Sequence, residues 1–262
     1  AARLPQPILL EGEAGVGKTE AAKALALALD TPLIRLQCYE GIDAGEALYE
    51  WNYTRQLLTI RLAEARGDHL ADADMFTADF LFERPILAAL RHPGPRPAVL
   101  LVDEIDRADD EFEAFLLEVL AESAVTIPEL GTQVALHPPI AILTSNRTRD
   151  LHDALKRRCL YHWIDYPSTP RATEIIRTRV PAAQQQLAEH VADAVARIRT
   201  LDVQKAPGIA EAISWVNALR LLDFEVLDEE AAAITIGSVL KYREDADLVV
   251  DQSLTWLVGS DV

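Results

Sequence analysis

Apolar and polar residues follow two different patterns along the 262 residues of the chain. In the first two-thirds, short apolar runs alternate with amphipathic stretches, which is typical of a parallel α/β sheet. The apolar runs that we expect to form strands are residues 7–10, 33–38, 98–102, 140–145 and 161–165. Helical patterns fill the last third, at residues 171–179, 182–201, 208–222 and 228–241. The change predicts an α/β domain over residues 1–168 and a helical domain over residues 169–262.

The segment between the second and third expected strands is long for a single crossover. Residues 41–46 open a first helix, and residues 77–90 are expected to form a second one. The apolar face of the first helical segment is continued by Trp51, Leu57, Leu58 and Leu62. Further along, residues 126–136 alternate around Gly131, which predicts a β-hairpin.

A glycine-rich segment joins the first expected strand to a helical pattern at residues 21–29. It consists of Gly12, Glu13, Ala14, Gly15, Val16, Gly17, Lys18 and Thr19, and Glu20 follows it. Glycines in such a turn let backbone N–H groups hold phosphate oxygens, and the helix N-terminus adds partial positive charge. Lys18 can reach the β- and γ-phosphates of a triphosphate, and the Thr19 hydroxyl can bind Mg²⁺. The segment, with Glu20, therefore predicts a site for ATP and Mg²⁺.

Two adjacent acids, Asp103 and Glu104, follow the expected strand at residues 98–102. Ligands of a parallel sheet bind at the carboxyl ends of its strands, so both acids are expected near the glycine-rich segment. Asp103 would lie beside Thr19 as a ligand of Mg²⁺ or of its water molecules. Glu104 is placed to polarise a water molecule for in-line attack on the γ-phosphate. The alternative for the pair alone is an ordinary strand end with two surface carboxylates.

Asn146 ends another apolar strand, and its uncharged amide could hold the attacking water molecule beside Glu104. Thr144 or Ser145 could share that role, and the alternative for Asn146 is a cap on the following turn. Arg157 and Arg158 end a short helical stretch before the last strand. Either one could be an arginine finger that reaches the nucleotide of a neighbouring subunit. The alternative is that both only complement the helix dipole.

Composition and charge limit the kinds of partner. The chain has 42 acidic and 25 basic residues, a formal net charge of −17, whereas non-specific nucleic-acid binding needs clustered Lys and Arg. Cys38 and Cys159 lie in apolar runs, which predicts buried free thiols in a reducing compartment, the cytoplasm. We expect no membrane span, because no run reaches about 18 apolar residues. The chain begins at Ala1 without Met, so we also expect residues upstream.

The order of these motifs resembles that of the AAA+ ATPases, and the resemblance covers the whole chain. Within this family the chain is most similar to the MoxR group, and within that group to CoxD-like members. The stretches that carry the narrower resemblance are residues 36–43, 100–108 and 155–159. It implies an AAA+ P-loop domain with a parallel five-stranded sheet of order 5-1-4-3-2, followed by a helical lid.

The resemblance also implies how such a protein works. It implies a homohexameric ring with two pore-facing insertions, a helical one at about residues 41–75 and a hairpin at about residues 124–139. MoxR proteins commonly act as chaperones that use ATP in the maturation of metalloenzymes, with a partner that carries a von Willebrand A domain. CoxD-like members are associated with the active site of molybdenum–copper carbon monoxide dehydrogenase.

Two positions depart from the family pattern. Lids of this family often carry an arginine that contacts the γ-phosphate, but the matching residues 207–215 hold no Arg. Glu211 is the nearest charged residue there, and Arg220 lies further along. Arg147 follows Asn146, where MoxR proteins usually have Pro. We therefore expect the lid to sense nucleotide differently, while the role of Asn146 is unaffected.

Two other functional classes are alternatives to this one. A nucleic-acid motor or loader is the alternative among ring-forming ATPases, and the acidic charge disfavours it. A small-molecule kinase is the third class. The Asp103–Glu104 pair, the two arginines and the helical C-terminal part disfavour that reading. No Asn-Lys-x-Asp motif follows the strand that carries Asp103, so guanine specificity is not expected.

Overall fold

The computed structural model describes residues 6–67 and 69–259, without the side chains of residues 72 and 73. The parts of the predicted domains and insert that fall on residues 1–5, 68 and 260–262 lie outside the described residues. By its internal contacts the chain forms two compact units. One comprises Ala1–Gly12 and Lys18–Trp163, and the other comprises Glu13–Gly17 and Ile164–Val262. The predicted boundary at residues 168 and 169 stays a prediction.

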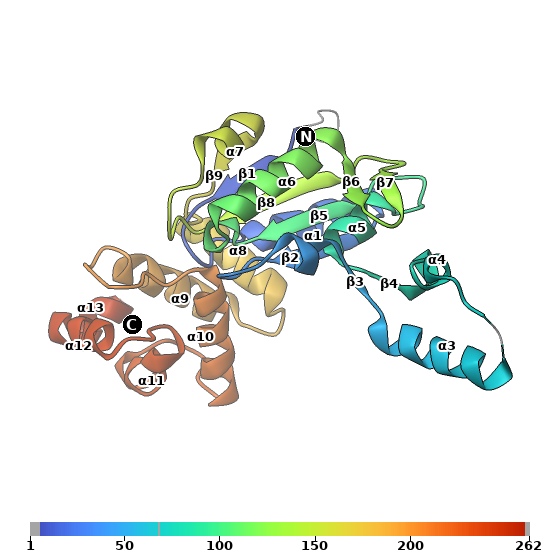
Figure 1. Cartoon of the computed structure of the whole chain (residues 1–262). Coiled ribbons are helices and arrows are strands. Elements are labelled where there is room, and N and C mark those ends of the chain that lie inside the picture. Colours follow the sequence, from blue (N-terminus) through green and yellow to red (C-terminus); the bar gives the residue numbers. More distant parts are fainter. Residues whose placement is uncertain (1–5, 68, 260–262) are drawn as a thin grey trace. The chain divides into compact units, whose positions relative to one another are not determined.

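Five strands of the first unit form one parallel sheet (Figure 1). They are β1 (Ile8–Glu11), β2 (Leu33–Gln37), β5 (Val99–Asp103), β8 (Ile140–Ser145) and β9 (Leu160–Trp163). Their order across the sheet is β2-β5-β8-β1-β9, and every neighbouring pair is parallel. When these five strands are numbered 1 to 5 along the chain and the sheet is read from β9 to β2, the order is 5-1-4-3-2. The expected sheet is thereby confirmed.

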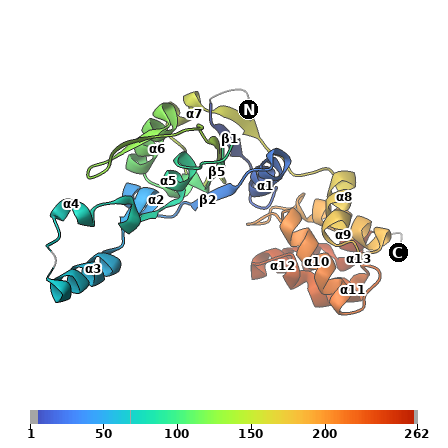
Figure 2. The same ribbon diagram turned by 90° about the vertical axis from the view of Figure 1, so that its right-hand side faces the viewer.

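Helices cover both faces of the sheet. All five residues of β5 are buried, so this interior strand has no exposed face. Leu100 and Val102 share one core with helices α5 (Pro85–Leu90), α6 (Asp110–Glu122) and α7 (Asp153–Arg158). Figure 2 shows α1 (Lys18–Leu29) on the other side of the sheet from α5 and α6. Asp103 shares that face with Leu101, and its carboxylate contacts Thr19 of α1 there. The acid therefore ends its strand on the side where the glycine-rich segment begins its helix.

The predicted helix over residues 77–90 was wrong. The chain there forms a 3₁₀ turn η1 (Ala78–Phe80), a strand β4 (Leu81–Glu83) and then α5. Pro85 disfavours helical backbone at the residue before it, and Arg84 is accordingly extended. β4 pairs antiparallel with β3 (Tyr49–Trp51), which follows the short helix α2 (Ala44–Leu48).

The expected apolar face of the insert is split by this ribbon. Trp51 is buried in β3, where it packs edge-on against Phe76. By contrast Leu57, Leu58 and Leu62, on helix α3 (Tyr53–Arg66), are exposed. The short helix α4 (Asp72–Met75) completes the insert. The three leucines of α3 therefore do not contribute to the core of the unit, whereas the apolar face of a continuous amphipathic helix would be buried.

The expected β-hairpin is present. β6 (Ala124–Ile127) pairs antiparallel with β7 (Gly131–Val134), and Ile127 lies opposite Gly131. The φ of Gly131 is 72°, a backbone conformation that favours glycine. The hairpin packs through Ile127, which is fully buried.

The second unit is helical. It contains α8 (Thr169–Arg179), α9 (Gln185–Ile198), α10 (Ile209–Leu221), α11 (Glu229–Thr235), η3 (Ile236–Ser238), α12 (Arg243–Gln252) and α13 (Leu254–Val258). Trp215 is fully buried in its core, and the indole Nε1 donates to Thr235 Oγ1 at 2.7 Å. The sequence did not predict α12 and α13. In neither unit is any described helix long and apolar enough to cross a membrane.

Candidate active site

The glycine-rich segment lies between β1 and α1, and Lys18 and Thr19 are the first two residues of that helix. Gly15 and Gly17 have φ values of 77° and 102°, which side-chain-bearing residues rarely adopt. Lys18 is 7 % exposed, and its ammonium donates to the carbonyl of Gly12 at 2.7 Å. The ammonium is therefore held against the loop that it is predicted to serve.

The remaining residues predicted around the nucleotide lie on the same loop and helix. Glu13, Ala14 and Val16 belong to the loop, and Glu20 is the third residue of α1. The Glu20 carboxylate accepts from Lys23 at 2.6 Å, on the surface of that helix. Its predicted contact with nucleotide stays a prediction.

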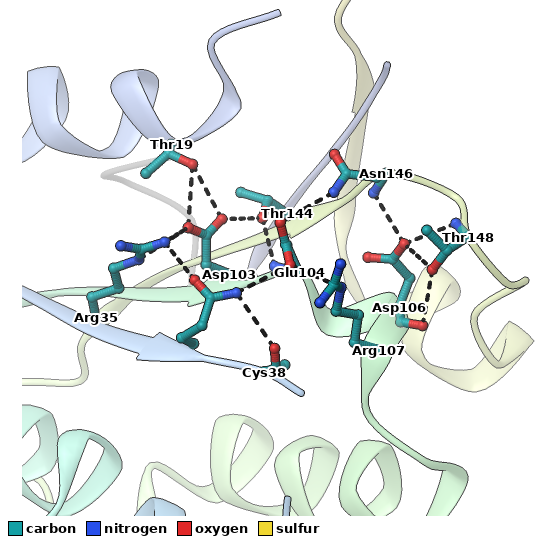
Figure 3. A network of polar contacts seen from close by, with 11 residues as sticks. Thr19, Arg35, Cys38, Asp103, Glu104, Asp106, Arg107, Thr144, Asn146 and Thr148 are labelled. Atoms are coloured by element: carbon teal, nitrogen blue, oxygen red, sulfur yellow. Dashed lines mark hydrogen bonds and ion pairs between the residues drawn. The ribbon is translucent and has the colours of Figure 1, made fainter. Parts of the chain in front are cut away.

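Thr19 and Asp103 are brought together from positions 84 residues apart in the chain (Figure 3). The Thr19 hydroxyl is 3.2 Å from both carboxylate oxygens of Asp103, which is 3 % exposed. The Thr144 hydroxyl donates to Asp103 Oδ1 at 2.5 Å. The acid is thus fixed by one hydroxyl from α1 and another from β8.

Two polar side chains of β2, which the sequence analysis did not single out, complete this group. The Arg35 guanidinium donates to Asp103 Oδ2 through Nε at 3.0 Å and through Nη2 at 2.6 Å. Gln37 lies opposite Asp103 in the sheet, and its amide donates to Glu104 Oε2 at 3.2 Å. Alternation puts both side chains on one face of β2, the edge strand beside the acids. The two polar residues, two positions apart in a predicted strand, were the feature of the sequence that could have indicated this contact with the acids.

Glu104 has an unusual backbone. Its φ of 56° and ψ of 50° lie in the left-handed region, which is uncommon for a residue with a long side chain. The carboxylate is 3.0 Å from Arg107 Nε and 3.5 Å from Asn146 Nδ2. The backbone N–H donates to Thr144 Oγ1 at 2.9 Å. The Glu104 side chain therefore contacts the loop after β8 as well as Gln37 of β2.

Asn146 lies at the start of that loop, beside Glu104 as the sequence predicted. Thr144 contacts both acids, whereas the Ser145 hydroxyl accepts from the backbone N–H of Arg147 at 3.0 Å. The Ser145 hydroxyl is therefore engaged in a local turn, whereas the Thr144 hydroxyl lies between the two acids.

Asp106, also missed from the sequence, holds the loop after β8. It is 2 % exposed, and its Oδ2 accepts from the backbone N–H groups of Asn146 and Thr148 at 3.2 and 2.9 Å. The Thr148 hydroxyl donates to the same oxygen at 2.7 Å. Asp106 belongs to the turn η2 (Ile105–Arg107) that follows Glu104, so this carboxylate ties the two loops together.

Arg157 and Arg158 lie apart from this network. They occupy the last turn of α7, and both are exposed. Neither forms a hydrogen bond or ion pair with any residue that the structure describes. The arrangement within one chain therefore brings together Lys18, Thr19, Asp103, Glu104 and Asn146, and leaves the two arginines outside.

The two thiols differ in their surroundings. Cys38 is buried at the end of β2, and burial, reinforced by the negative charges of Asp103, Asp106 and Glu104, raises its pKa to about 12. Cys159 is half-buried, and burial raises its pKa to about 11. Both are free cysteines, as the sequence predicted, but only Cys38 is buried as expected, and Cys159 is partly exposed.

The lid position that lacks the family arginine is engaged locally. Glu211 accepts from the backbone N–H of Gly208 at 3.0 Å and so caps the N-terminus of α10. This carboxylate stabilises its own helix, which favours an acid at that position for a structural reason.

The donor set at Thr19 and Asp103 fits Mg²⁺. It offers a hydroxyl and a carboxylate oxygen within 3.2 Å of each other, and Mg²⁺ prefers oxygen ligands. No cluster of three or more His, Cys, Asp or Glu that could hold a metal occurs among the described residues. Mg²⁺ in phosphate-transfer sites uses one or two protein ligands, with phosphate and water oxygens for the rest.

Comparisons with known proteins give a family and a fold. Residues 7–159 match the model of the AAA domain (dynein-related subfamily). An uncharacterized protein of Staphylococcus haemolyticus is 25 % identical over 222 residues, which cover 82 % of this chain and 76 % of that protein. Denitrification regulatory protein NirQ of Pseudomonas aeruginosa is 22 % identical over 246 residues, with 89 % and 83 % covered.

Solved structures show the same fold. A mutant of RuvB from Thermotoga maritima superimposes with a TM-score of 0.52 at 16 % sequence identity. The match covers 88 % of this chain but only 62 % of the RuvB chain. At this identity the likeness concerns the fold alone.

Proposed function

Since the chain belongs to the AAA domain family, dynein-related subfamily, we propose that it is an ATPase that couples hydrolysis of Mg-ATP to the remodelling of a protein substrate. One observation carries the proposal. Lys18 and Thr19 begin α1, and the Thr19 hydroxyl contacts the carboxylate of Asp103, which Glu104 follows in the chain. A helix start with a lysine and a hydroxyl beside two acids is what binding and hydrolysis of a triphosphate require.

Each residue has a distinct role in this proposal. The loop from Gly12 to Thr19 holds the phosphates, and Lys18 contacts the β- and γ-phosphates. Thr19 and Asp103 would hold Mg²⁺, which neutralises negative charge on the phosphates. Glu104 accepts a proton from the attacking water molecule, and Asn146, 3.5 Å from Glu104, orients that water.

The finer assignment is a MoxR-like chaperone that forms a homohexameric ring. The similarity to NirQ over most of both chains supports this group, and the exposed arginines at the end of α7 suit a site completed by a neighbouring subunit. The proposed substrate is a protein of the metalloenzyme class, and a von Willebrand A domain protein is the proposed partner. The CoxD-like assignment stays a prediction. The net charge of −17 continues to disfavour a nucleic-acid motor.

Calorimetric titration with ATP and Mg²⁺ tests the proposal. We expect wild-type protein to bind ATP and Lys18→Ala to lose binding, because the variant lacks the ammonium that contacts the phosphates. Lys23→Ala is the matched control, since Lys23 lies on the same helix but is exposed and paired with Glu20. Equal ATP affinity in all three proteins would contradict the proposal. Turnover that increases when DNA is added would favour the nucleic-acid alternative instead.

A further inference from the structure

The carboxylate of Asp103 is already paired with a cation of the chain itself. Arg35 places two donors on Asp103 Oδ2, at 3.0 and 2.6 Å, while Thr144 donates to Oδ1. Every oxygen that Asp103 could offer to a metal or its water shell therefore carries a donor from the protein. A divalent cation binds that carboxylate more weakly while the guanidinium is also bound to it, because the two positive charges repel each other.

The position of Arg35 makes such an exchange possible. Its side chain is 52 % exposed, whereas that of Asp103 is 5 % exposed. Arg35 lies on the edge strand β2, so it can turn outward without leaving a buried charge unpaired. Gln37 offers it a second acceptor, because Gln37 Oε1 also accepts from Arg35 Nη2. The Arg35 guanidinium thus keeps an acceptor on its own strand when Asp103 acquires another partner.

We propose that Arg35 acts as an internal counter-ion that occupies Asp103 before Mg²⁺ arrives and that Mg²⁺ must displace. This inference rests on the proposed function and adds a positioning residue to it. Arg35 neutralises Asp103 when nucleotide is absent, and its displacement sets the Mg²⁺ concentration at which the site loads. The residue tunes metal affinity and takes no part in bond breaking.

The test measures metal affinity and does not depend on turnover. Mn²⁺ binding is followed by electron paramagnetic resonance in protein saturated with the non-hydrolysable analogue AMP-PNP. Arg35→Gln should bind Mn²⁺ about three- to tenfold more tightly than wild type, the scale of a half-exposed charge pair beside a second cation. The same variant should bind AMP-PNP more weakly in EDTA, because Asp103 then repels the phosphates uncompensated.

Two further variants serve as controls. Arg61→Gln changes the net charge equally but lies on α3 in an exposed pair with Glu64, and it should leave Mn²⁺ affinity unchanged. Arg35→Lys keeps the charge and loses the two-donor geometry, and we expect a rise of about two- to threefold. It also carries the test if circular dichroism shows that Arg35→Gln does not fold.

The outcomes separate the two proposals. Unchanged or weaker Mn²⁺ affinity in the folded Arg35 variants would overturn the counter-ion role while AMP-PNP binding still supports an ATPase. Absence of AMP-PNP binding by the wild-type protein, with and without Mn²⁺, would overturn both.

Discussion

The acids at the ends of the strands and the arginines at the end of α7 are built in opposite ways. Asp103, Glu104 and Asp106 each accept from several groups of the same chain, which lie on β2, on β8 and in the loop after β8. Arg157 and Arg158 are exposed and have no polar partner among the described residues. A carboxylate held by several donors of its own chain is positioned within that chain, whereas an exposed charge without a partner is available to another molecule. The contrast fits the proposal of a catalytic site shared between two subunits.

The largest expected effect tests the role of the exposed arginines. If Arg158 completes the site of a neighbour, Arg158→Ala should lower turnover by roughly 10³–10⁵, the usual contribution of an arginine finger. Mixing Arg158→Ala subunits with Lys18→Ala subunits should restore part of the activity, because some interfaces then combine an intact loop with an intact finger. ATP turnover of the mixture and of each variant alone is the measurement.

Arg157 is the alternative finger, and the same mixing experiment applies to Arg157→Ala. No recovery, despite demonstrated exchange of subunits, would count against a shared site. A fully active double variant, with both arginines replaced by Ala, would exclude both residues.

The second effect concerns the acid side. Glu104→Gln keeps the shape and most of the contacts of the side chain but cannot accept a proton. We expect ATP binding to persist and hydrolysis to fall about a hundredfold or more, the scale of a lost general base. Glu118→Gln, on the exposed face of α6, is the matched control and should hydrolyse ATP at the wild-type rate. Near-normal turnover in Glu104→Gln would make Glu104 a surface acid.

The third effect sharpens what the acid network does for the fold. Asp106→Ala leaves three donors of the loop after β8 without their buried acceptor, which costs about 1–3 kcal/mol of unfolding free energy. Urea denaturation measures this loss. Asp150→Ala removes an exposed acid of the same loop region and should change the unfolding free energy by less than about 0.5 kcal/mol. Equal losses in the two variants would deny Asp106 its special role.

The smallest effect uses the two thiols as reporters of the two regions. Burial raises the pKa of both thiols, and Cys38, which is buried beside three carboxylates, is the more strongly affected and the less exposed of the two. Iodoacetamide should therefore alkylate Cys159 faster than Cys38, as followed by peptide mass spectrometry. Faster labelling of Cys38 would mean that the strand ends open more readily than the helix end.

The same pKa values fix the direction of a pH effect. Both thiols have a folded-state pKa above the ordinary value of 9.0, so the folded state favours the neutral form. Their effect on stability is absent below about pH 9, and stability falls as the pH rises from there toward 12. Replacement of Cys38 by Ser should lessen the decline.

How far the sequence leads depends on whether a residue acts through its own neighbours in the chain. Lys18 and Thr19 follow a glycine-rich turn, and Asp103 follows a continuous apolar strand, so local pattern alone located them. The order of the strands then places those motifs together. Arg35 could not be found that way, because its partner lies 68 residues away and only the pairing of β2 with β5 brings them together.

The fold shows the same limit in the insert. The apolar residues at 77–90 have a spacing that suits a helix, but Pro85 and pairing with β3 divide the segment into β4 and α5. Trp51 likewise looked helical and lies in β3 because a strand partner from a distant segment completes the ribbon. Pairing between segments, which local periodicity does not encode, decided these elements.

The backbone of Glu104 has a consequence for how such a protein can change over time. A left-handed conformation at a long side chain costs on the order of 1–3 kcal/mol, whereas Asn tolerates it well. Stability alone would therefore favour another residue at this position, and the proposed catalytic role is a reason for an acid there despite the cost. We expect Glu104→Asn to unfold at a higher urea concentration than wild type while it fails to turn over ATP. Copies of this gene that are no longer selected for activity should lose Glu104 early, and their unfolding free energy should rise when they do.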